Sequence, residues 1–168
     1  PSVARVWVLR AALTPETASD EYGMRDDPHT LRVSIPIKGG FLSRAVFKED
    51  KPKYVKSGAD TEYYPLYHDR KRPVVICEDI MSAIKVHKTG FNSIAILGTA
   101  FTPTVASEVS QFPIAVCWTD GDKAGDKAWV AVRKRMALHP TNVVRVRTDN
   151  DPKNIHSAEI RRLIGEQL

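Results

Sequence analysis

Cysteine is scarce in this sequence, and long apolar runs are absent from it. The chain of 168 residues has two cysteines, Cys77 and Cys117, each inside an apolar run, which excludes a disulfide scaffold and a four-cysteine zinc site. No stretch approaches about 18 consecutive apolar residues, which excludes a transmembrane helix. The first residues lack the pattern of a secretory signal. We therefore expect a cytoplasmic protein with no membrane partner, in the host cytoplasm if the source is a virus.

Charge of either sign is not extreme. The composition, 42% hydrophobic and 27% charged, is that of a globular protein and excludes a disordered tail or a fibre. The formal net charge is +5, and the excess is concentrated in residues 41–72, which carry eight Lys and Arg against five Asp and Glu. A basic surface suits a phosphate-rich partner, but many proteins without one carry a similar charge.

The chain changes character near residue 72. Residues 1–72 consist of short elements separated by turn residues, and we expect a small mixed α+β lobe with an antiparallel sheet. Thr14-Pro15-Glu16 is a typical helix start, with Thr as N-cap and Pro at the first position. Alternating apolar residues over 31–37 and 41–47, joined by Gly39-Gly40, predict a hairpin.

Residues 73–168 alternate between buried strands and helices. Four compact apolar runs are separated by helical patterns, which indicates an α/β domain with about four parallel strands flanked by helices. The four runs are Val74–Cys77, Ile94–Leu97, Ile114–Trp118 and Val143–Val146. The helical patterns lie near residues 80–87, 103–109, 124–136 and 160–168.

Carboxylates follow three of these four strands. Glu78-Asp79 comes directly after the first run, Asp120-Gly121-Asp122 after the third, and Asp149-Asn150-Asp151 after the fourth. The carboxyl ends of parallel strands meet at one edge of a sheet, so we expect these acidic side chains to gather there. Their charges would repel one another unless a cation lay among them. Oxygen ligands of this kind favour Mg²⁺ or Mn²⁺ over zinc.

A simpler interpretation exists for single residues of this set. Asp is common at helix N-caps, and Asp122 taken alone is better explained as the cap of the following helix. For Glu78, Asp120 and Asp122 together, at equivalent strand ends, we favour a metal site. Ions held by a few carboxylates, with room for phosphate oxygens, serve phosphoryl transfer.

The acidic motifs carry a family resemblance. A strand ending in Glu78, followed later by a strand ending in Asp120-Gly121-Asp122-Lys123-Ala124-Gly125, resembles the Toprim domain of primases, topoisomerases and related nucleases. The small residues of the second motif would let its helix approach the sheet. The resemblance covers about residues 73–155 and implies a Toprim fold.

Two segments of the N-terminal lobe favour one of these Toprim families, the replicative primases. Gly40-Phe41-Leu42-Ser43-Arg44 and Lys51-Pro52-Lys53-Tyr54-Val55 resemble the segment that precedes Toprim in bacterial and bacteriophage replicative primases. The chain thus resembles a primase catalytic fragment without the zinc-binding module or the helicase that often flank it. The implied division is a basic N-terminal lobe over 1–72 and a Toprim domain over 73–168.

The first and third motifs depart from the family pattern. Asp79 stands where primases usually have Gly after the Glu, and Ser82 stands where an Asp often follows. The third motif, Asp151-Pro152-Lys153-Asn154, has Asn where the family usually has Asp. Asp79, Asp149 or Asp151 could supply the missing charge, so the ligands of a second ion stay open.

The resemblance implies a role for each matched residue. Asp120 and Asp122 would bind Mg²⁺ or Mn²⁺, with Asp79 and Asp151 as further candidate ligands. Glu78 would either bind a second ion or act as general base for a ribose 3′-hydroxyl that attacks the α-phosphorus of a nucleoside triphosphate. The first lobe would hold the ribonucleoside triphosphate or the DNA template through basic and aromatic residues: Arg44, Lys51, Lys53, Tyr54 and Lys56.

Three functions remain in view. The resemblance implies RNA primer synthesis on single-stranded DNA by divalent-metal-dependent nucleotidyl transfer, with a replicative helicase, fused or separate, as a partner. A Toprim nuclease or topoisomerase-type cleavage domain would use the same carboxylates, although no active-site tyrosine domain is apparent. The irregular first and third motifs suggest a third function, a non-catalytic nucleic-acid-binding remnant.

Overall fold

The chain forms two compact units, Pro1–Thr61 and Glu62–Leu168. The computed structural model describes residues 2–9, 13–27, 29–47, 49, 51–58, 60–98 and 100–168. The sequence analysis set the boundary near residue 72, whereas the structure assigns residues 62–72 to the second unit, because strand β5 (Tyr63–Leu66) pairs with that unit's sheet. Over the described residues, no helix combines the length and the apolar character needed to cross a bilayer.

The first unit contains a four-stranded antiparallel sheet and two short helices. Helices α1 (Ser2–Leu9) and α2 (Pro15–Asp20) precede the sheet. The strands follow one another in the order β1-β2-β3-β4. They are β1 (Arg25–Asp27), β2 (Arg32–Ile37), β3 (Gly40–Ala45) and β4 (Tyr54–Ser57).

Local sequence signals account for these elements. The side chain of Thr14 accepts a hydrogen bond from the backbone N–H of Thr17 at 3.1 Å and so caps α2, as predicted. The alternate residues of β2 that face the core are buried: Val33, Ile35 and Ile37. Gly39 has a φ of 84° in the two-residue turn between β2 and β3, a conformation that favours glycine. The predicted hairpin is confirmed.

The second unit contains a five-stranded sheet in the order β5-β7-β6-β8-β9. Strands β6 (Val74–Cys77), β7 (Asn92–Ile96), β8 (Ile114–Asp120) and β9 (Asn142–Thr148) are parallel to one another. These are the four predicted strands. The antiparallel strand β5 lies at the edge and was not predicted; its Pro65 is tolerated there because an edge strand needs fewer ladder hydrogen bonds.

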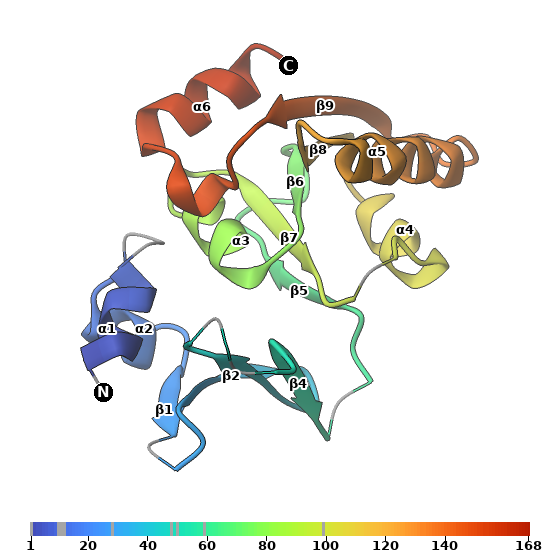
Figure 1. The fold of residues 1–168 in the computed structure, drawn as a ribbon. Coiled ribbons are helices and arrows are strands. Elements are labelled where there is room, and N and C mark those ends of the chain that lie inside the picture. Colours follow the sequence, from blue (N-terminus) through green and yellow to red (C-terminus); the bar gives the residue numbers. More distant parts are fainter. Residues whose placement is uncertain are drawn as a thin grey trace. The chain divides into compact units, whose positions relative to one another are not determined.

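Helices cover both faces of this second sheet. Figure 1 shows α3 (Ile80–His87) and α6 (Ser157–Gly165) on one face, with α4 (Pro103–Val109) and α5 (Lys123–Met136) on the other. A short 3-10 helix, η1 (Pro152–Asn154), lies between β9 and α6. Cys77 and Cys117 are buried in the sheet and free. The predicted α/β architecture, preceded by a small mixed lobe, is confirmed.

The register brings the carboxyl ends of β6, β8 and β9 to one edge. Ile76 near the end of β6 pairs with Cys117 of β8, and Trp118 of β8 pairs with Val146 of β9. Because these strands are neighbours and parallel, the three acidic segments that follow them leave the sheet on the same side.

Candidate active site

Three carboxylates, Glu78, Asp120 and Asp122, lie at the ends of two paired strands, and we call them the Glu78 group. Glu78 is the first residue after β6, Asp120 is the last residue of β8, and Asp122 is the N-cap of α5. Burial is the largest cause of the raised pKa of Glu78, and the charges of Asp120 and, more weakly, Asp122 add to it, so both aspartates lie within electrostatic range of Glu78. The structure therefore places these three predicted residues at the same edge of the sheet, within electrostatic range of one another.

Glycines allow the close approach of α5 to β8 that positions this group. A Cβ atom on Gly125 would lie 2.1 Å from the carbonyl oxygen of Asp120, so a side chain there would force the helix away from the strand. A Cβ on Gly121 would lie 2.3 Å from Oδ1 of Asp149. Oδ1 of Asp122 accepts a hydrogen bond from the backbone N–H of Gly125 at 2.8 Å, so Asp122 is the N-cap of α5, as the simpler interpretation predicted. Its other carboxylate oxygen takes no part in this cap.

The Glu78 group carries negative charge that the nearby Lys153 offsets only in part. Glu78 is an exposed residue, yet desolvation of its carboxyl group raises its pKa, and the charges of Asp120 and Asp151 raise it further. Desolvation also raises the pKa of Asp120, followed by the charges of Asp151 and Asp122. Within the described part of the chain, neither Glu78 nor Asp120 forms an ion pair. A cation placed here would relieve the repulsion.

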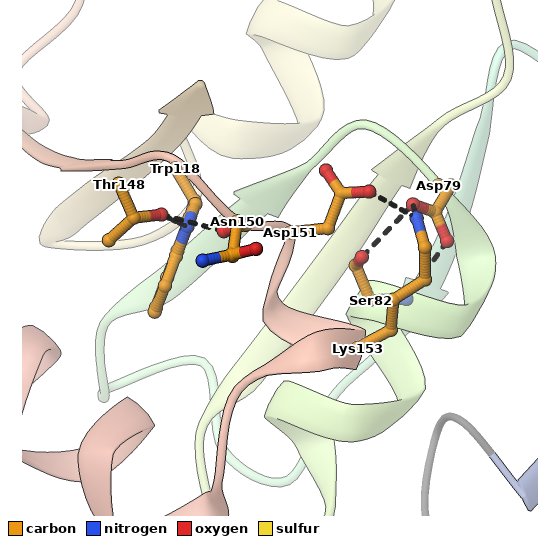
Figure 2. A network of polar contacts seen from close by, with 7 residues as sticks. All are labelled: Asp79, Ser82, Trp118, Thr148, Asn150, Asp151 and Lys153. Carbon is orange, nitrogen blue, oxygen red and sulfur yellow. Dashed lines mark hydrogen bonds and ion pairs between the residues drawn. The ribbon is translucent and has the colours of Figure 1, made fainter. Parts of the chain in front are cut away.

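A second acidic set, which we call the Lys153 group, lies beside the first and consists of Asp79, Asp151 and Lys153. The Nζ atom of Lys153 donates to Oδ2 of Asp79 at 2.6 Å and also contacts Oδ2 of Asp151 (Figure 2). Asp79 is in addition the N-cap of α3, because its Oδ1 accepts the backbone N–H of Ser82 at 3.0 Å. The two aspartates predicted as further metal ligands are thus bound to an ammonium group.

The sequence analysis did not single out Lys153. Burial lowers the pKa of Lys153, but the charge of Asp79 and the hydrogen bonds that Lys153 donates to both aspartates outweigh that effect and raise the pKa above its usual value. The available signal was the position of Lys153 two residues after Asp151, in a turn that Pro152 begins. The position of Lys153 near Asp151 is a weak signal, because it gives no reason to expect that Lys153 also contacts Asp79, which is distant in the sequence.

Polar contacts also fix the loops around both groups. Trp118 is buried, as expected for a core residue, and its Nε1 donates to Oγ1 of Thr148 at 2.9 Å. The hydroxyl of Thr148 donates in turn to the carbonyl oxygen of Asn150 at 2.7 Å (Figure 2). Arg147 donates to the carbonyl oxygen of Gly121 at 2.5 Å. The acidic loops after β8 and β9 are therefore held by neighbouring side chains.

The donor set suits a magnesium or manganese ion held by few protein ligands. Among the described residues, no three His, Cys, Asp or Glu side chains are arranged to hold a metal ion as they stand. Mg²⁺ is, however, usually bound through one or two carboxylates, with water and substrate phosphates as its other ligands. Two carboxylates are enough for such an ion. The carboxylate of Asp120 and the second oxygen of Asp122 can supply these ligands, because they lie in a region of excess negative charge.

A cavity of about 620 Å³ adjoins the Glu78 group. Glu78, Lys127 and Arg135 contribute charged side chains to its lining. Its apolar lining comes from the sheet, the loop before α4 and helix α5, and includes Ile76, Phe101, Trp118 and Val132. This volume lies within the range of pockets that hold small organic ligands.

The basic residues predicted to bind nucleotide or template lie on β3, on β4 and just before β4 in the first unit. Arg44 of β3 pairs with Tyr54 of β4, and its guanidinium carbon lies 5.0 Å from the centroid of the Tyr54 ring. Nζ of Lys53 lies 5.6 Å from the same centroid. Nζ of Lys56 donates to the carbonyl oxygen of Thr61 at 2.8 Å, and Lys51 is exposed. Three of the five predicted residues, Arg44, Lys53 and Tyr54, thus form one cluster.

Comparison with known sequences finds a family match for the segment that contains the Glu78 group. Residues 72–147 match the Toprim domain family. A DNA primase of Campylobacter jejuni is 39% identical over 62 residues, a stretch that makes up 35% of this chain and 10% of that protein. The chain therefore matches about a tenth of the length of this curated relative.

Solved structures extend the likeness to both units. A structure with the zinc-binding and RNA polymerase domains of the Aquifex aeolicus primase matches 98% of this chain and 56% of its own length, with a TM-score of 0.75 and 20% identity. The primase fragment of the bacteriophage T7 primase-helicase protein matches 94% of this chain and 71% of its own length, with a TM-score of 0.54 and 15% identity. At such identities the likeness concerns the fold. Residues 72–147 therefore resemble a Toprim domain in sequence, and the chain is similar in fold to bacterial and phage DNA primase fragments.

Proposed function

We propose that the chain is the catalytic fragment of a DNA primase, which synthesises short RNA primers on single-stranded DNA by divalent-metal-dependent nucleotidyl transfer. The observation that carries the proposal is the Glu78 group, in which two carboxylates have raised pKa values and a third lies beside them. The likeness to primase structures over both units supports this function over that of other Toprim proteins, as does the primase relative.

The carboxylates divide the chemical work. Asp120 and Asp122 would hold a Mg²⁺ or Mn²⁺ ion. When bound, such an ion neutralises triphosphate charge and stabilises the charge that develops on the transferred phosphoryl group. Glu78 accepts the proton of the ribose 3′-hydroxyl as the 3′-oxygen forms its bond to the α-phosphorus and the bond to pyrophosphate breaks. Its raised pKa makes this carboxylate a better proton acceptor near neutral pH than an ordinary glutamate.

Basic residues of the first unit would bind the ribonucleoside triphosphate or the template backbone. Arg44, Lys51, Lys53 and Lys56 supply the positive charge that phosphates require. Arg44 and Lys53 already lie near the ring of Tyr54, so a base that stacks on this ring would share it with one of the two cations. A replicative helicase is the proposed protein partner, since the T7 relative is part of a primase-helicase protein.

A primer-synthesis assay tests this function. The 168-residue chain is incubated with single-stranded DNA, labelled ribonucleotides and Mn²⁺, and the products are separated by length. We expect dinucleotides and short RNA, and we expect Asp120→Asn to abolish them while circular dichroism shows the variant to be folded. Folded wild-type chain that binds Mn²⁺ but forms no phosphodiester bond on any template would contradict the proposal.

The same reaction separates primer synthesis from the competing functions. Cleavage of the DNA without ribonucleotides, lost in Asp120→Asn, would assign the carboxylates to a Toprim nuclease instead. DNA binding that is unchanged by Asp120→Asn, without synthesis or cleavage, would indicate a non-catalytic nucleic-acid-binding remnant.

A further inference from the structure

The Lys153 group joins segments that are far apart in the sequence. Lys153 lies on η1 and Asp79 at the start of α3, and the distance between Nζ of Lys153 and Oδ2 of Asp79 is 2.6 Å. Their side chains are 23% and 15% exposed, so water screens this ion pair less than it would screen a pair on the surface. Figure 2 shows the ammonium group between the carboxylates of Asp79 and Asp151.

The carboxylate of Asp79 has little capacity left for another cation. Its Oδ1 accepts the backbone N–H of Ser82 at 3.0 Å, and its Oδ2 accepts both the hydroxyl of Ser82 at 3.0 Å and the ammonium of Lys153. A carboxylate offers about four lone-pair positions. A divalent ion on Asp79 would have to displace Lys153 or lie beside its positive charge.

The same contacts coincide with two departures from the family motif. Asp79 and Ser82 both differ from the residues usual at their positions in primases, and the structure joins them to each other and to Lys153. Asp79 and Ser82 are therefore parts of a single hydrogen-bonded arrangement that contains its own cation, Lys153.

We propose that the ammonium group of Lys153 is a built-in cation that takes the place of a second divalent ion, so that the chain binds one such ion, at Asp120 and Asp122. This inference rests on the proposed function, because it takes the ion site of the Glu78 group as given. Within that group, Lys153 then supplies one fixed positive charge beside the ion site, and Asp79 and Asp151 are not metal ligands.

A count of bound Mn²⁺ tests this proposal without relying on activity. Free Mn²⁺ is measured by electron paramagnetic resonance during titration of the 168-residue chain, and the bound ions per chain are obtained by difference. We expect one ion for the wild type and one for Lys153→Arg, which keeps the charge. We expect two for Lys153→Met, because this variant frees Asp79 and Asp151, and one again for the double variant Asp79→Asn with Lys153→Met.

A second variant keeps the test valid if Lys153→Met does not fold. Asp79→Asn alone keeps a side chain able to cap α3, and we expect it to bind one Mn²⁺ with less than about a threefold change in affinity. A tenfold weaker affinity in this variant would make Asp79 a ligand and overturn the proposal.

The remaining outcomes distinguish this inference from the proposed function. Two ions on the wild type, or one ion on folded Lys153→Met, would overturn the role of Lys153 and leave metal-dependent transfer intact. No ion on the wild type would overturn the one-ion count together with the metal site of the proposed function.

Discussion

Glu78 and Asp79 are neighbours in the chain, but their carboxylates have opposite surroundings. Burial raises the pKa of Glu78, and repulsion by nearby carboxylates, Asp120 first among them, raises it further. Asp79 caps α3 and contacts the ammonium of Lys153. One carboxylate therefore costs stability in the metal-free protein, while the next contributes to it. The comparison shows that acidic residues gathered at one sheet edge need not share a function, because the groups that contact each carboxylate decide what it can bind.

The largest expected effect concerns catalysis, and it separates the Glu78 group from another acid at the same edge. Glu78→Gln removes the proposed proton acceptor, and Asp120→Asn removes a proposed ion ligand. Each should lower the rate of nucleotidyl transfer by at least about 100-fold in the primer-synthesis assay. Asp149→Asn, which changes an exposed carboxylate outside both groups, should leave the rate within about threefold of the wild type. Equal losses of the transfer rate in all three variants would contradict the special role of the Glu78 group.

The next effect concerns the packing that places Asp120 in the Glu78 group. Gly125→Ala should lower the free energy of unfolding by about 2 kcal/mol, because its Cβ would lie 2.1 Å from the backbone oxygen of Asp120. Gly165→Ala is the matched control, since its Cβ would meet no atom of the described residues within 4 Å beyond its own stretch of helix, and it should be neutral or stabilise by up to about 1 kcal/mol. Urea unfolding of both variants measures the difference. A Gly125→Ala variant as stable as the control would contradict the close approach of α5 to β8.

A smaller loss is expected from the Lys153 group. Asp79→Asn keeps an N-cap for α3 but removes the ion pair with Lys153, and we expect a loss of about 1 kcal/mol in the free energy of unfolding in metal-free buffer at pH 7. Asp79→Ala should cost about 1 kcal/mol more, because it also removes the cap. Equal stability of Asp79→Asn and the wild type would show that the pair contributes nothing.

The smallest effect has the opposite sign and depends on pH. Glu78→Gln removes a repelled charge and should raise the free energy of unfolding at pH 7 by less than about 1 kcal/mol, because solvent screens part of the interaction. The folded pKa of Glu78 lies above the unfolded value of about 4.5, so the cost of its charge appears as pH rises through the folded pKa. The gain from Glu78→Gln should therefore vanish below about pH 4.5. A gain that persists at pH 4 would have another cause.

The sequence predicted those features that depend on local pattern. The hairpin around Gly39 and the cap at Thr14 follow from short-range signals, and the four parallel strands follow from buried apolar runs. Strand β5 escaped prediction because an edge strand with a proline has no distinctive pattern. Lys153 escaped because its partner Asp79 lies 74 residues away, and one sequence does not give tertiary contacts of side chains.

The most direct test of the account is to locate a divalent ion by anomalous diffraction from a crystal soaked in Mn²⁺. We predict one strong peak within coordination distance of carboxylate oxygens of Asp120 and Asp122, with the ammonium of Lys153 still between Asp79 and Asp151. A peak at Asp79 and Asp151 with Lys153 displaced, or no peak near Asp120 and Asp122, would contradict it.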